Sequence, residues 1–254
     1  MFALRTTVVV LFLLAWPVGP DAVAQVGLGS TLWAWTDSAA HHEAVVNVSL
    51  DGGSGTGIIV AVDRDKPVSD GYEGYCLTAN HVVESDNDRR AIKLRYRNGR
   101  TVSHCKVVKS DPQSDIALLW VWVPADVRPV RIADREARPN DWLEFAGLGG
   151  ASDPACCLRT FSSKASVPTN EDILFADVSL LPGDSGGPVF NDHRELVGII
   201  SGGWMWWDGK IVTAQGNPIS ATWPARAANV SVIKKMIDNS AAMLVSRDDS
   251  SVTK

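Results

Sequence analysis

The sequence predicts an all-β protein of two six-stranded antiparallel β-barrels packed together, followed by a C-terminal α-helix. Three observations lead to this fold class. Short runs rich in β-branched and aromatic residues recur along the chain, separated by turn residues, as expected of β-barrels. A polar, proline-bearing stretch, Arg135–Asn140, divides these runs into two groups. Near the C-terminus, apolar residues recur at the spacing of one helical face: Val230, Ile233, Met236 and Ile237.

The first 24 residues are typical of a secretory signal peptide and are excluded from the fold. Arg5 supplies the positive start, Val8 to Trp16 the apolar run, and Ala22-Val23-Ala24 the small-residue cleavage site. The apolar run is too short to cross a bilayer comfortably. We therefore expect a secreted or periplasmic chain that starts near Gln25. Residues 25–40 would then cap the barrel or take part in oligomerisation.

The first barrel is expected over residues 41–133. Its opening hairpin is indicated by Asp51-Gly52-Gly53-Ser54, a turn sequence between two apolar runs. Each expected strand is short and ends at turn residues. The strands are Ala44–Leu50, Gly55–Val62, Tyr75–Thr78, Ala91–Arg97, Thr101–Val108 and Ile116–Val123.

The second barrel is expected over residues 134–225, with a helix and tail over residues 226–254. The amphipathic helix is expected to pack on the barrels. Seven short segments are candidates for the strands of this barrel: Trp142–Gly147, Leu158–Ser166, Ile173–Val178, Pro188–Phe190, Leu196–Ser201, Lys210–Thr213 and Ile219–Trp223.

The formal net charge is −5, and signal removal leaves it unchanged because Arg5 and Asp21 cancel. Nucleic-acid binding would need a clustered basic face and is not expected. Basic residues do gather in one predicted hairpin, but their near-alternate spacing favours one solvated sheet face over a binding patch. These residues are Arg89, Arg90, Lys93, Arg95, Arg97 and Arg100.

Four cysteines in an exported chain can form disulfides. Cys76 and Cys105 lie on strands of the same expected barrel, so we favour a disulfide between them. Cys156 and Cys157 are adjacent in a loop rich in Gly, Ser and Pro, where a bridge would be strained but can form. A zinc site is a weaker alternative, because the cysteine spacing matches no common ligand pattern.

The segment most informative about chemistry is Pro182–Pro188, with the sequence PGDSGGP. A serine hydroxyl is a weak nucleophile until a base removes its proton. Glycines on both sides of Asp184-Ser185 let the backbone turn sharply and aim N–H groups, notably those of Gly183 and Ser185, at one point. A bare G-x-S-x-G pattern is equally compatible with a simple turn, so the interpretation depends on the segments upstream.

Two upstream segments supply the partners of such a serine. Residues 76–83, CLTANHVV, form a short apolar strand that delivers His81. Residues 114–120, SDIALLW, place Asp115 at the head of a strongly apolar strand. With these three motifs in this order, the chain resembles the trypsin/chymotrypsin-like serine peptidases, and more closely their bacterial HtrA branch. The resemblance covers roughly residues 41–240.

The resemblance implies a chymotrypsin-like serine endopeptidase whose active site lies between the barrels, acting on polypeptides without a cofactor or metal ion. His81 becomes the general base, Asp115 its orienting carboxylate and Ser185 the nucleophile. The oxyanion hole falls to Gly183, Asp184 and Ser185. The residues expected to line the substrate pocket are Ser179, Leu180, Leu181, Ile200, Ser201, Gly202 and Gly203.

The expected pocket carries no fixed anion for a Lys or Arg side chain. Ser179 stands six residues before Ser185, where trypsin-like enzymes have an aspartate. Leu180 and Ile200 are apolar neighbours in the sequence of the pocket walls. We therefore expect cleavage after small or medium apolar residues.

The chain departs from the family at two points. HtrA proteins usually carry a C-terminal PDZ domain, and too few residues follow Pro224 for one. Digestive and clotting relatives are cut before an Ile-Val-Gly-Gly start, whose new amino group pairs with the acid preceding the nucleophile. No such start occurs near residues 25–50, so Asp184 either binds another group or is solvated. We expect no proteolytic activation beyond removal of the signal peptide.

Two alternative functions compete with this interpretation. The α/β-hydrolases share the glycine–serine pattern, but they need the chain order serine, acid, histidine. Here His193, in an expected turn, is the only histidine after Ser185. The second alternative is a catalytically inactive binding module on the protease fold, because fold alone never proves function. The presence of all three triad residues within their motifs favours catalysis.

Two further clusters have competing explanations. Trp204-Met205-Trp206-Trp207 occupies an expected hairpin tip, where it would pack across strands or form an exposed aromatic rim that holds an unfolded chain. His41 and His42 invite a metal site, but in an extended segment adjacent side chains point to opposite faces, so a shared ligand role is not expected. His104 is expected at the surface or in a turn.

Overall fold

The computed structural model describes residues 40–50, 53–84, 92–165, 167–168, 172–175, 180–203, 205–207, 210–212 and 225–238. All of them belong to one compact unit, Thr31–Lys254. The expected signal peptide, residues 25–39, the strand Ile219–Trp223 and the C-terminal tail lie outside the described residues. Within the described part, no helix is long and apolar enough to cross a membrane.

The first sheet is antiparallel and is preceded by a 3₁₀ helix, η1 (Ala40–Ala44). A short α-helix, α1 (Asn80–Val83), follows its third strand. The expected opening hairpin is present, with Leu50 paired to Gly53. The strands are β1 (Val45–Leu50), β2 (Gly53–Val68), β3 (Gly71–Thr78), β4 (Lys93–Arg95), β5 (Thr101–Val102), β6 (Cys105–Asp111) and β7 (Ile116–Pro124), in the sheet order β5-β4-β1-β2-β3-β7-β6.

The second sheet follows a stretch that includes the expected linker Arg135–Asn140, in which no strand forms. Its strands are β8 (Trp142–Gly147), β9 (Arg159–Lys164), β10 (Val167–Pro168), β11 (Asp172–Phe175), β12 (Pro188–Phe190), β13 (Leu196–Gly203) and β16 (Ala225–Asn229). Their order is β10-β11-β16-β13-β12-β8-β9. The helix α2 (Pro154–Cys157) precedes β9, and β14 (Met205–Trp207) pairs with β15 (Lys210–Val212) in a separate hairpin.

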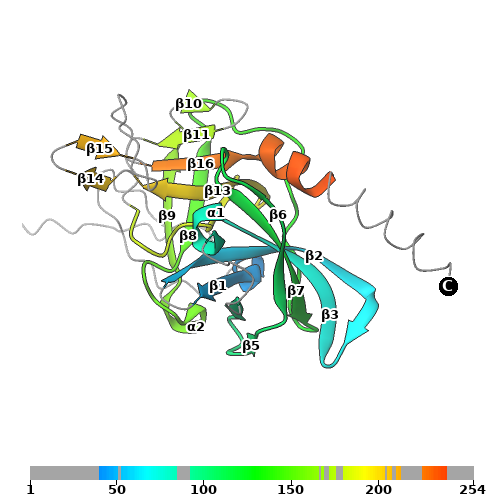
Figure 1. The fold of residues 1–254 in the computed structure, drawn as a ribbon. Coiled ribbons are helices and arrows are strands. Elements are labelled where there is room, and N and C mark those ends of the chain that lie inside the picture. Colours follow the sequence, from blue (N-terminus) through cyan, green and yellow to red (C-terminus); the bar gives the residue numbers. More distant parts are fainter. Residues whose placement is uncertain are drawn as a thin grey trace, which may run out of the picture. The chain divides into compact units, whose positions relative to one another are not determined.

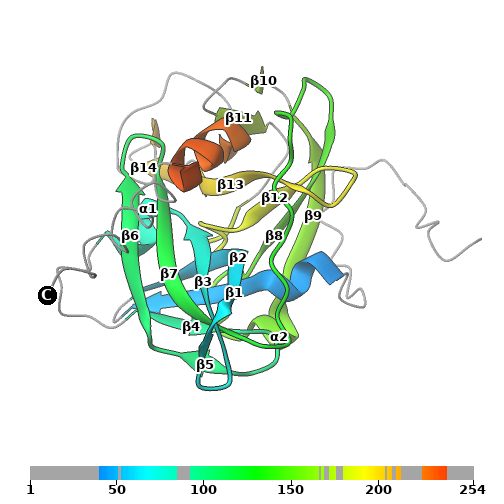
Figure 2. The same ribbon diagram turned by 90° about the vertical axis from the view of Figure 1, so that its right-hand side faces the viewer.

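Both main sheets are antiparallel and curled, as Figures 1 and 2 show, which confirms the predicted fold class. Each described sheet has seven strands rather than six. In the first sheet, the expected strand Thr101–Val108 divides into β5 and β6, which lie at opposite edges. In the second, β10 and β16 join the sheet, whereas the expected strand Lys210–Thr213 pairs in the separate β14–β15 hairpin. Strand β2 continues to Val68, past its expected end at Val62, because its last residues form an exposed hairpin arm with β3.

The C-terminal helix spans residues 230–238 (Figure 2), and residues 226–229, expected to belong to the helical segment, lie in β16 instead. The helix packs on both barrels, as predicted. Ile233 and Met236, 0% and 3% exposed, join the core that fills the first sheet. Val230, 1% exposed, joins the second core. That core includes Phe145 and Phe175, whose rings meet edge to face with centroids 4.4 Å apart. The helix therefore contributes to both cores.

The predicted disulfide between Cys76 and Cys105 is wrong, because both residues are free thiols. Cys76 lies on β3 and Cys105 on β6, and β7 runs between these strands. Two strand spacings separate the backbones by roughly 10 Å, more than the ~7 Å that a disulfide can bridge. The disulfide in the structure joins Cys156 and Cys157 in α2.

Two predictions about charged residues also need correction. Arg95 donates to Asp153 at 2.8 Å and Arg97 to the Pro154 carbonyl at 2.9 Å, so these arginines are tied to the α2 segment rather than fully solvated. His41 and His42 lie in η1, not in an extended segment. With about three residues per turn, adjacent side chains of a 3₁₀ helix differ by roughly 120° and can converge.

Candidate active site

His81 and Asp115 meet because the strands next to them are neighbours. Thr78, the last residue of β3, pairs with Ala117 near the start of β7. His81 lies in α1, just after β3, and Asp115 directly precedes β7. The Nδ1 atom of His81 is 2.8 Å from Oδ2 of Asp115, and the His81 N–H donates to Oδ1 at 3.0 Å.

The Asp115 carboxylate is shielded from water, with 2% of its side chain exposed, whereas the His81 side chain is 25% exposed. Asp115 has a φ of +53°, a left-handed conformation that is uncommon outside glycine and persists where the surrounding structure fixes it. A carboxylate that accepts the Nδ1 proton holds the imidazole in the tautomer whose Nε2 can take up a proton. The pair is therefore suited to general-base chemistry.

The segment that carries Ser185 packs against the same end of the first sheet. The Ser185 carbonyl accepts a hydrogen bond from the Thr56 N–H at 2.8 Å. Gly186 has a φ of +84°, and a Cβ there would lie 2.1 Å from the Thr56 carbonyl and 2.3 Å from Thr78 Oγ1. Only glycine permits this approach. It brings the serine segment of the second barrel against β2 and against the end of β3 that leads to His81.

The turn before Ser185 is held on two sides. Gly183 has a φ of +98°, and its carbonyl accepts from Thr56 Oγ1 at 2.6 Å. The Asp184 N–H donates to the Leu181 carbonyl at 3.0 Å. This bond corrects one prediction: the Asp184 N–H is already used, so the candidate oxyanion donors are the N–H groups of Gly183 and Ser185.

Asp184 is completely buried and binds a partner that the sequence reasoning missed. Its Oδ2 contacts the guanidinium of Arg159, the first residue of β9, and accepts from the Leu181 N–H at 2.8 Å. Its Oδ1 accepts from the Gly149 N–H at 2.8 Å. A buried carboxylate is tolerated only when it is paired and hydrogen-bonded, and Asp184 is both. Of the two expectations for Asp184, the first therefore holds, because it binds another group.

A family model described as a trypsin-like peptidase domain matches residues 55–199, which include His81, Asp115 and Ser185. The chain belongs to this family.

Curated relatives of this trypsin-like peptidase domain include two periplasmic proteins. The periplasmic serine endoprotease DegP of Salmonella typhimurium is 31% identical over 150 residues, covering 57% of this chain and 29% of that protein. The periplasmic pH-dependent serine endoprotease DegQ of Escherichia coli is 31% identical over 152 residues, covering 58% of this chain and 30% of that protein. The chain thus spans less than a third of the length of these relatives.

The fold of the trypsin-like peptidase domain also matches a solved structure. The crystal structure of the serine endoprotease from Yersinia pestis superposes with a TM-score of 0.56 at 21% identity, covering 81% of this chain and 67% of that chain. This likeness agrees with the fold class assigned above.

The residues expected to line the substrate pocket have different environments. Leu181 is 39% exposed and Leu180 is partly buried, so both border the surface beside the serine turn. Ile200, 1% exposed, belongs to the second core, and Ser201 is 4% exposed. Gly202 and Gly203 continue β13 past a bulge. Ser179 lies outside the described residues.

The predicted hairpin around the tryptophan cluster is present as the β14–β15 pair, and Trp204 lies outside the described residues. His104, expected at the surface or in a turn, stacks on Trp122 with ring centroids 3.9 Å apart and an interplanar angle of 6°.

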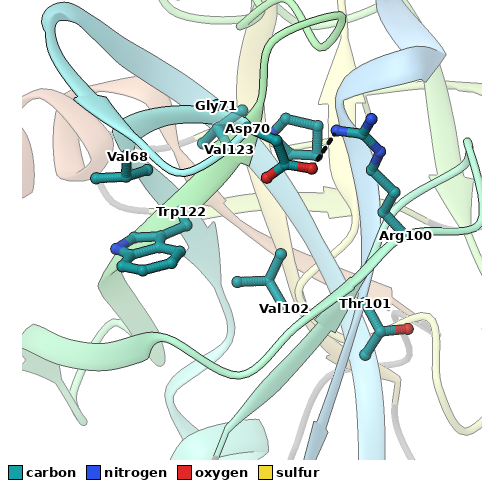
Figure 3. A pocket seen from close by; sticks show the side chains of 9 residues that line it. Val68, Asp70, Gly71, Arg100, Thr101, Val102, Trp122 and Val123 are labelled. Carbon is teal, nitrogen blue, oxygen red and sulfur yellow. Dashed lines mark ion pairs between the residues drawn. The ribbon is translucent and has the colours of Figure 1, made fainter.

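A pocket of about 190 Å³ opens on the first barrel, and Trp122 is among the residues that line it. Figure 3 shows Trp122 on one side of it and the ion pair between Arg100 and Asp70, 2.9 Å long, on the other. Its lining contains none of the predicted catalytic or substrate-pocket residues. We assign it no role in the reaction.

Burial shifts the pKa of several groups outside the candidate site. Burial raises the pKa of the Cys76 thiol far above its usual value and that of Cys105 to about 12, so both stay protonated at neutral pH. Burial also raises the pKa of Glu144, but hydrogen bonds from His41 and His42 outweigh this effect and lower it to about 2. Among the residues that the structure describes, His41, His42 and Glu144 form the group that could hold a metal ion.

Proposed function

We propose that this trypsin-like peptidase is an exported serine endopeptidase that hydrolyses peptide bonds through Ser185, His81 and Asp115. The hydrogen bond of 2.8 Å between His81 and the buried Asp115 carries the proposal, because it prepares a base at the point where the serine segment packs. The match to a trypsin-like peptidase domain over residues 55–199 supports it.

The proposed reaction passes through an acyl-enzyme. His81 Nε2 takes the proton of the Ser185 hydroxyl while the Ser185 Oγ attacks the peptide carbonyl. The N–H groups of Gly183 and Ser185 stabilise the oxyanion, and each such donor is typically worth about 3 kcal/mol in the transition state. His81 then gives its proton to the leaving amine as the C–N bond breaks. Water, deprotonated by His81, attacks the ester, which releases the acid and returns the proton to Ser185.

The ion pair between Arg159 and Asp184, the residue before Ser185, supports activity without a zymogen step. In relatives activated by cleavage, a new amino group pairs with the acid before the nucleophile. Here the guanidinium of Arg159 already contacts Asp184. A cation supplied by the second barrel itself needs no cleavage to reach its position.

The proposed substrates are polypeptides cleaved after small or medium apolar residues, in the periplasm or outside the cell. Leu180 and Leu181 offer apolar surface beside the turn, and Leu181 is 39% exposed. DegP and DegQ, to which the chain is similar, are periplasmic serine endoproteases.

A cleavage profile tests this proposal. The purified protein and its Ser185→Ala variant are each incubated with one model protein, folded and denatured, and the products are identified by mass spectrometry. We expect cleavage by the wild type alone, after Ala, Val, Ile or Leu, and faster on the denatured substrate. Products that are the same with Ser185→Ala would refute the catalytic role, and a profile dominated by Lys, Arg or Glu would refute the preference. A folded protein that binds these substrates without cutting them would be the inactive binding module.

A further inference from the structure

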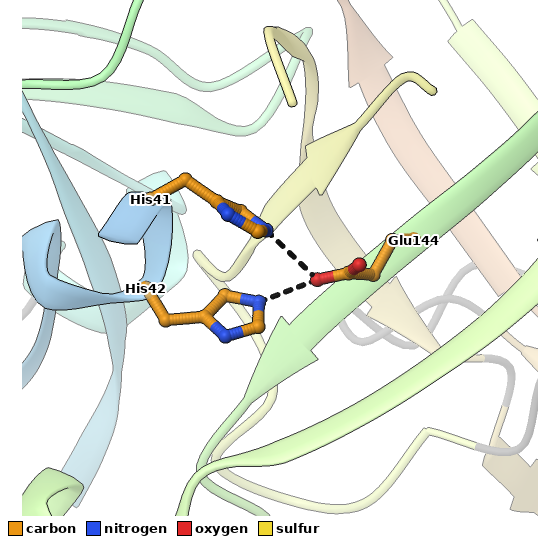
Figure 4. A group of neighbouring side chains, drawn as sticks. All are labelled: His41, His42 and Glu144. Carbon is orange, nitrogen blue, oxygen red and sulfur yellow. Dashed lines mark hydrogen bonds and ion pairs between the residues drawn. The ribbon is translucent and has the colours of Figure 1, made fainter. Parts of the chain in front are cut away.

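Two histidines and a glutamate converge at the junction of the two barrels, and none of them belongs to the three motifs that carry His81, Asp115 and Ser185. His41 and His42 come from η1, at the start of the first barrel, and Glu144 comes from β8 of the second (Figure 4). The Nε2 atom of His41 is 3.1 Å from Oε1 of Glu144, and Nε2 of His42 contacts the same oxygen. All three candidate ligand atoms lie within 4.8 Å of one another.

The two imidazoles are held in place before any ion binds. Their side chains are 7% and 5% exposed, and that of Glu144 is 33% exposed. The ring of His41 meets the ring of Phe190 edge to face, with centroids 4.7 Å apart and an interplanar angle of 88°. The two rings are therefore buried and fixed, whereas the carboxylate of Glu144 is partly exposed.

The donor set matches the preferences of zinc. Zn²⁺ binds imidazole nitrogen and carboxylate oxygen at about 2.0–2.2 Å, which places tetrahedral ligand atoms about 3.3 Å apart. The 3.1 Å between His41 and Glu144 is close to this value. Mg²⁺ and Ca²⁺ prefer sites made of oxygen ligands, so two imidazoles disfavour them.

The alternative to a metal ion is one carboxylate oxygen that accepts protons from both rings. That arrangement requires each histidine to carry its proton on Nε2. The Nδ1 atom of His41 is buried, and within the described residues it has no hydrogen-bond partner. Without an ion, this favours the His41 proton on Nε2, facing Glu144. A metal ion at Nε2 would displace that proton and leave it on Nδ1, so binding the ion must outweigh the cost of one buried N–H without an acceptor.

We propose that His41, His42 and Glu144 bind one Zn²⁺ ion, with water as the fourth ligand, and that the ion ties the start of the first barrel to β8. Strand β8 runs on to Leu148 and Gly149, whose N–H groups donate to Thr56 Oγ1 at 3.1 Å and to Asp184 at 2.8 Å. The ion would thus stabilise the strand that supports the serine turn. This site stands apart from the proposed catalytic residues and does not depend on them.

Metal binding is tested with the full-length secreted protein, purified without a polyhistidine tag and freed of metal with a chelator. Titration calorimetry with Zn²⁺ should give one site per chain, and the melting temperature should rise with Zn²⁺ concentration, because a ligand that binds the native state stabilises it. Co²⁺ bound in place of Zn²⁺ should show the strong visible absorption of a tetrahedral nitrogen and oxygen site, without the charge-transfer band of a thiolate ligand.

Three variants separate this site from adventitious binding. Glu144→Gln and His42→Gln should each weaken Zn²⁺ binding by more than the roughly 10–100-fold that loss of a supporting residue costs. His193→Gln is the matched control, because exposed His193 also pairs with a carboxylate, Asp192, at 2.7 Å. It should bind Zn²⁺ like the wild type, as should His81→Gln.

The wild-type measurements decide the matter even where a variant fails to fold. A wild type without a tetrahedral Co²⁺ spectrum, or with a thiolate band, would overturn the proposal. So would Zn²⁺ binding that survives both Glu144→Gln and His42→Gln, or that is lost in His81→Gln. If the protein binds Zn²⁺ as expected yet never cleaves a substrate, the metal site stands and the proposed catalytic function fails.

Discussion

Replacing Arg159 by methionine should distort the turn that precedes Ser185, because it leaves the buried carboxylate of Asp184 without its cation. Asp184 is 0% exposed, and its Oδ2 contacts the Arg159 guanidinium. Breaking a buried pair by removing one partner typically costs about 3–5 kcal/mol. Asp184 keeps its two hydrogen bonds from the Gly149 and Leu181 N–H groups, so we expect a cost near the lower end. If this cost of about 3 kcal/mol destabilises the active conformation of the turn, the fraction of molecules in that conformation drops about 100-fold, because roughly 1.4 kcal/mol corresponds to a tenfold change.

The assay for Arg159→Met combines kcat/KM on a denatured protein substrate with thermal unfolding. Arg100→Met is the matched control, because Arg100 is 47% exposed and pairs with Asp70, which is 71% exposed, and an ion pair between exposed groups contributes little. Adding Asp184→Asn to Arg159→Met should recover part of the lost stability, because the buried charge is gone while an oxygen remains for the Gly149 N–H. An Arg159→Met protein with wild-type kcat/KM and wild-type stability would refute the reasoning.

Four further expectations follow from the same geometry. Asp115→Asn should keep its circular dichroism spectrum yet lose roughly 10⁴-fold in kcat by presenting the wrong imidazole tautomer. Asp111→Asn should stay active, because Asp111 caps a turn by accepting from the N–H groups of Gln113 and Ser114 at 3.0 and 3.3 Å. An inactive Asp111→Asn beside an active Asp115→Asn would mean that the wrong acid is named. Gly186→Ala should fail to reach the native melting temperature, because its Cβ would lie 2.1 Å from a carbonyl oxygen, and a fully stable variant would contradict this. Protein with only its signal peptide removed should be fully active, and activity that appears only after a defined internal cut, seen by mass spectrometry, would contradict that. Hydrogen bonds from His41 and His42 lower the pKa of Glu144 to about 2 against the effect of burial, so in the presence of a chelator the wild type should be more stable than Glu144→Gln above the ordinary pKa of 4.5. This difference in unfolding free energy should fade as the pH falls towards about 2. Denaturant melts that show no such loss would count against it.

The residues proposed as the triad were named from sequence because three motifs resemble those of the peptidase family, and two of these motifs adjoin a local strand signal. His81 follows the apolar end of β3, and Asp115 precedes the apolar β7. Once two such strands are neighbours, their ends bring the side chains together. The pairing partner of Asp184 had no such signal. Arg159 lies 25 residues away in sequence, and nothing local distinguishes it from the other arginines. The only available hint was the need of any buried carboxylate for a cation.

Long-range order and local backbone geometry account for the wrong predictions. The strand order that inserts β7 between Cys76 and Cys105 is a property of the whole sheet, so membership of one barrel could not decide their distance. His41 and His42 converge because η1 is a 3₁₀ helix. Two adjacent histidines in a sequence do not indicate that conformation. The last strand, Ala225–Asn229, lacks β-branched residues altogether. It forms because β11 and β13 pair on either side, a case in which tertiary context overrides propensity.

The most direct test of the proposed function is covalent labelling by a fluorophosphonate, which reacts with a serine only when a base activates it. The modified residue is located by peptide mass spectrometry in the wild type, Ser185→Ala and His81→Ala. We predict a single adduct on Ser185 in the wild type and none in either variant, with all three proteins folded by circular dichroism. A folded wild type that is never labelled at Ser185, or a His81→Ala protein labelled as fast as the wild type, would contradict the account.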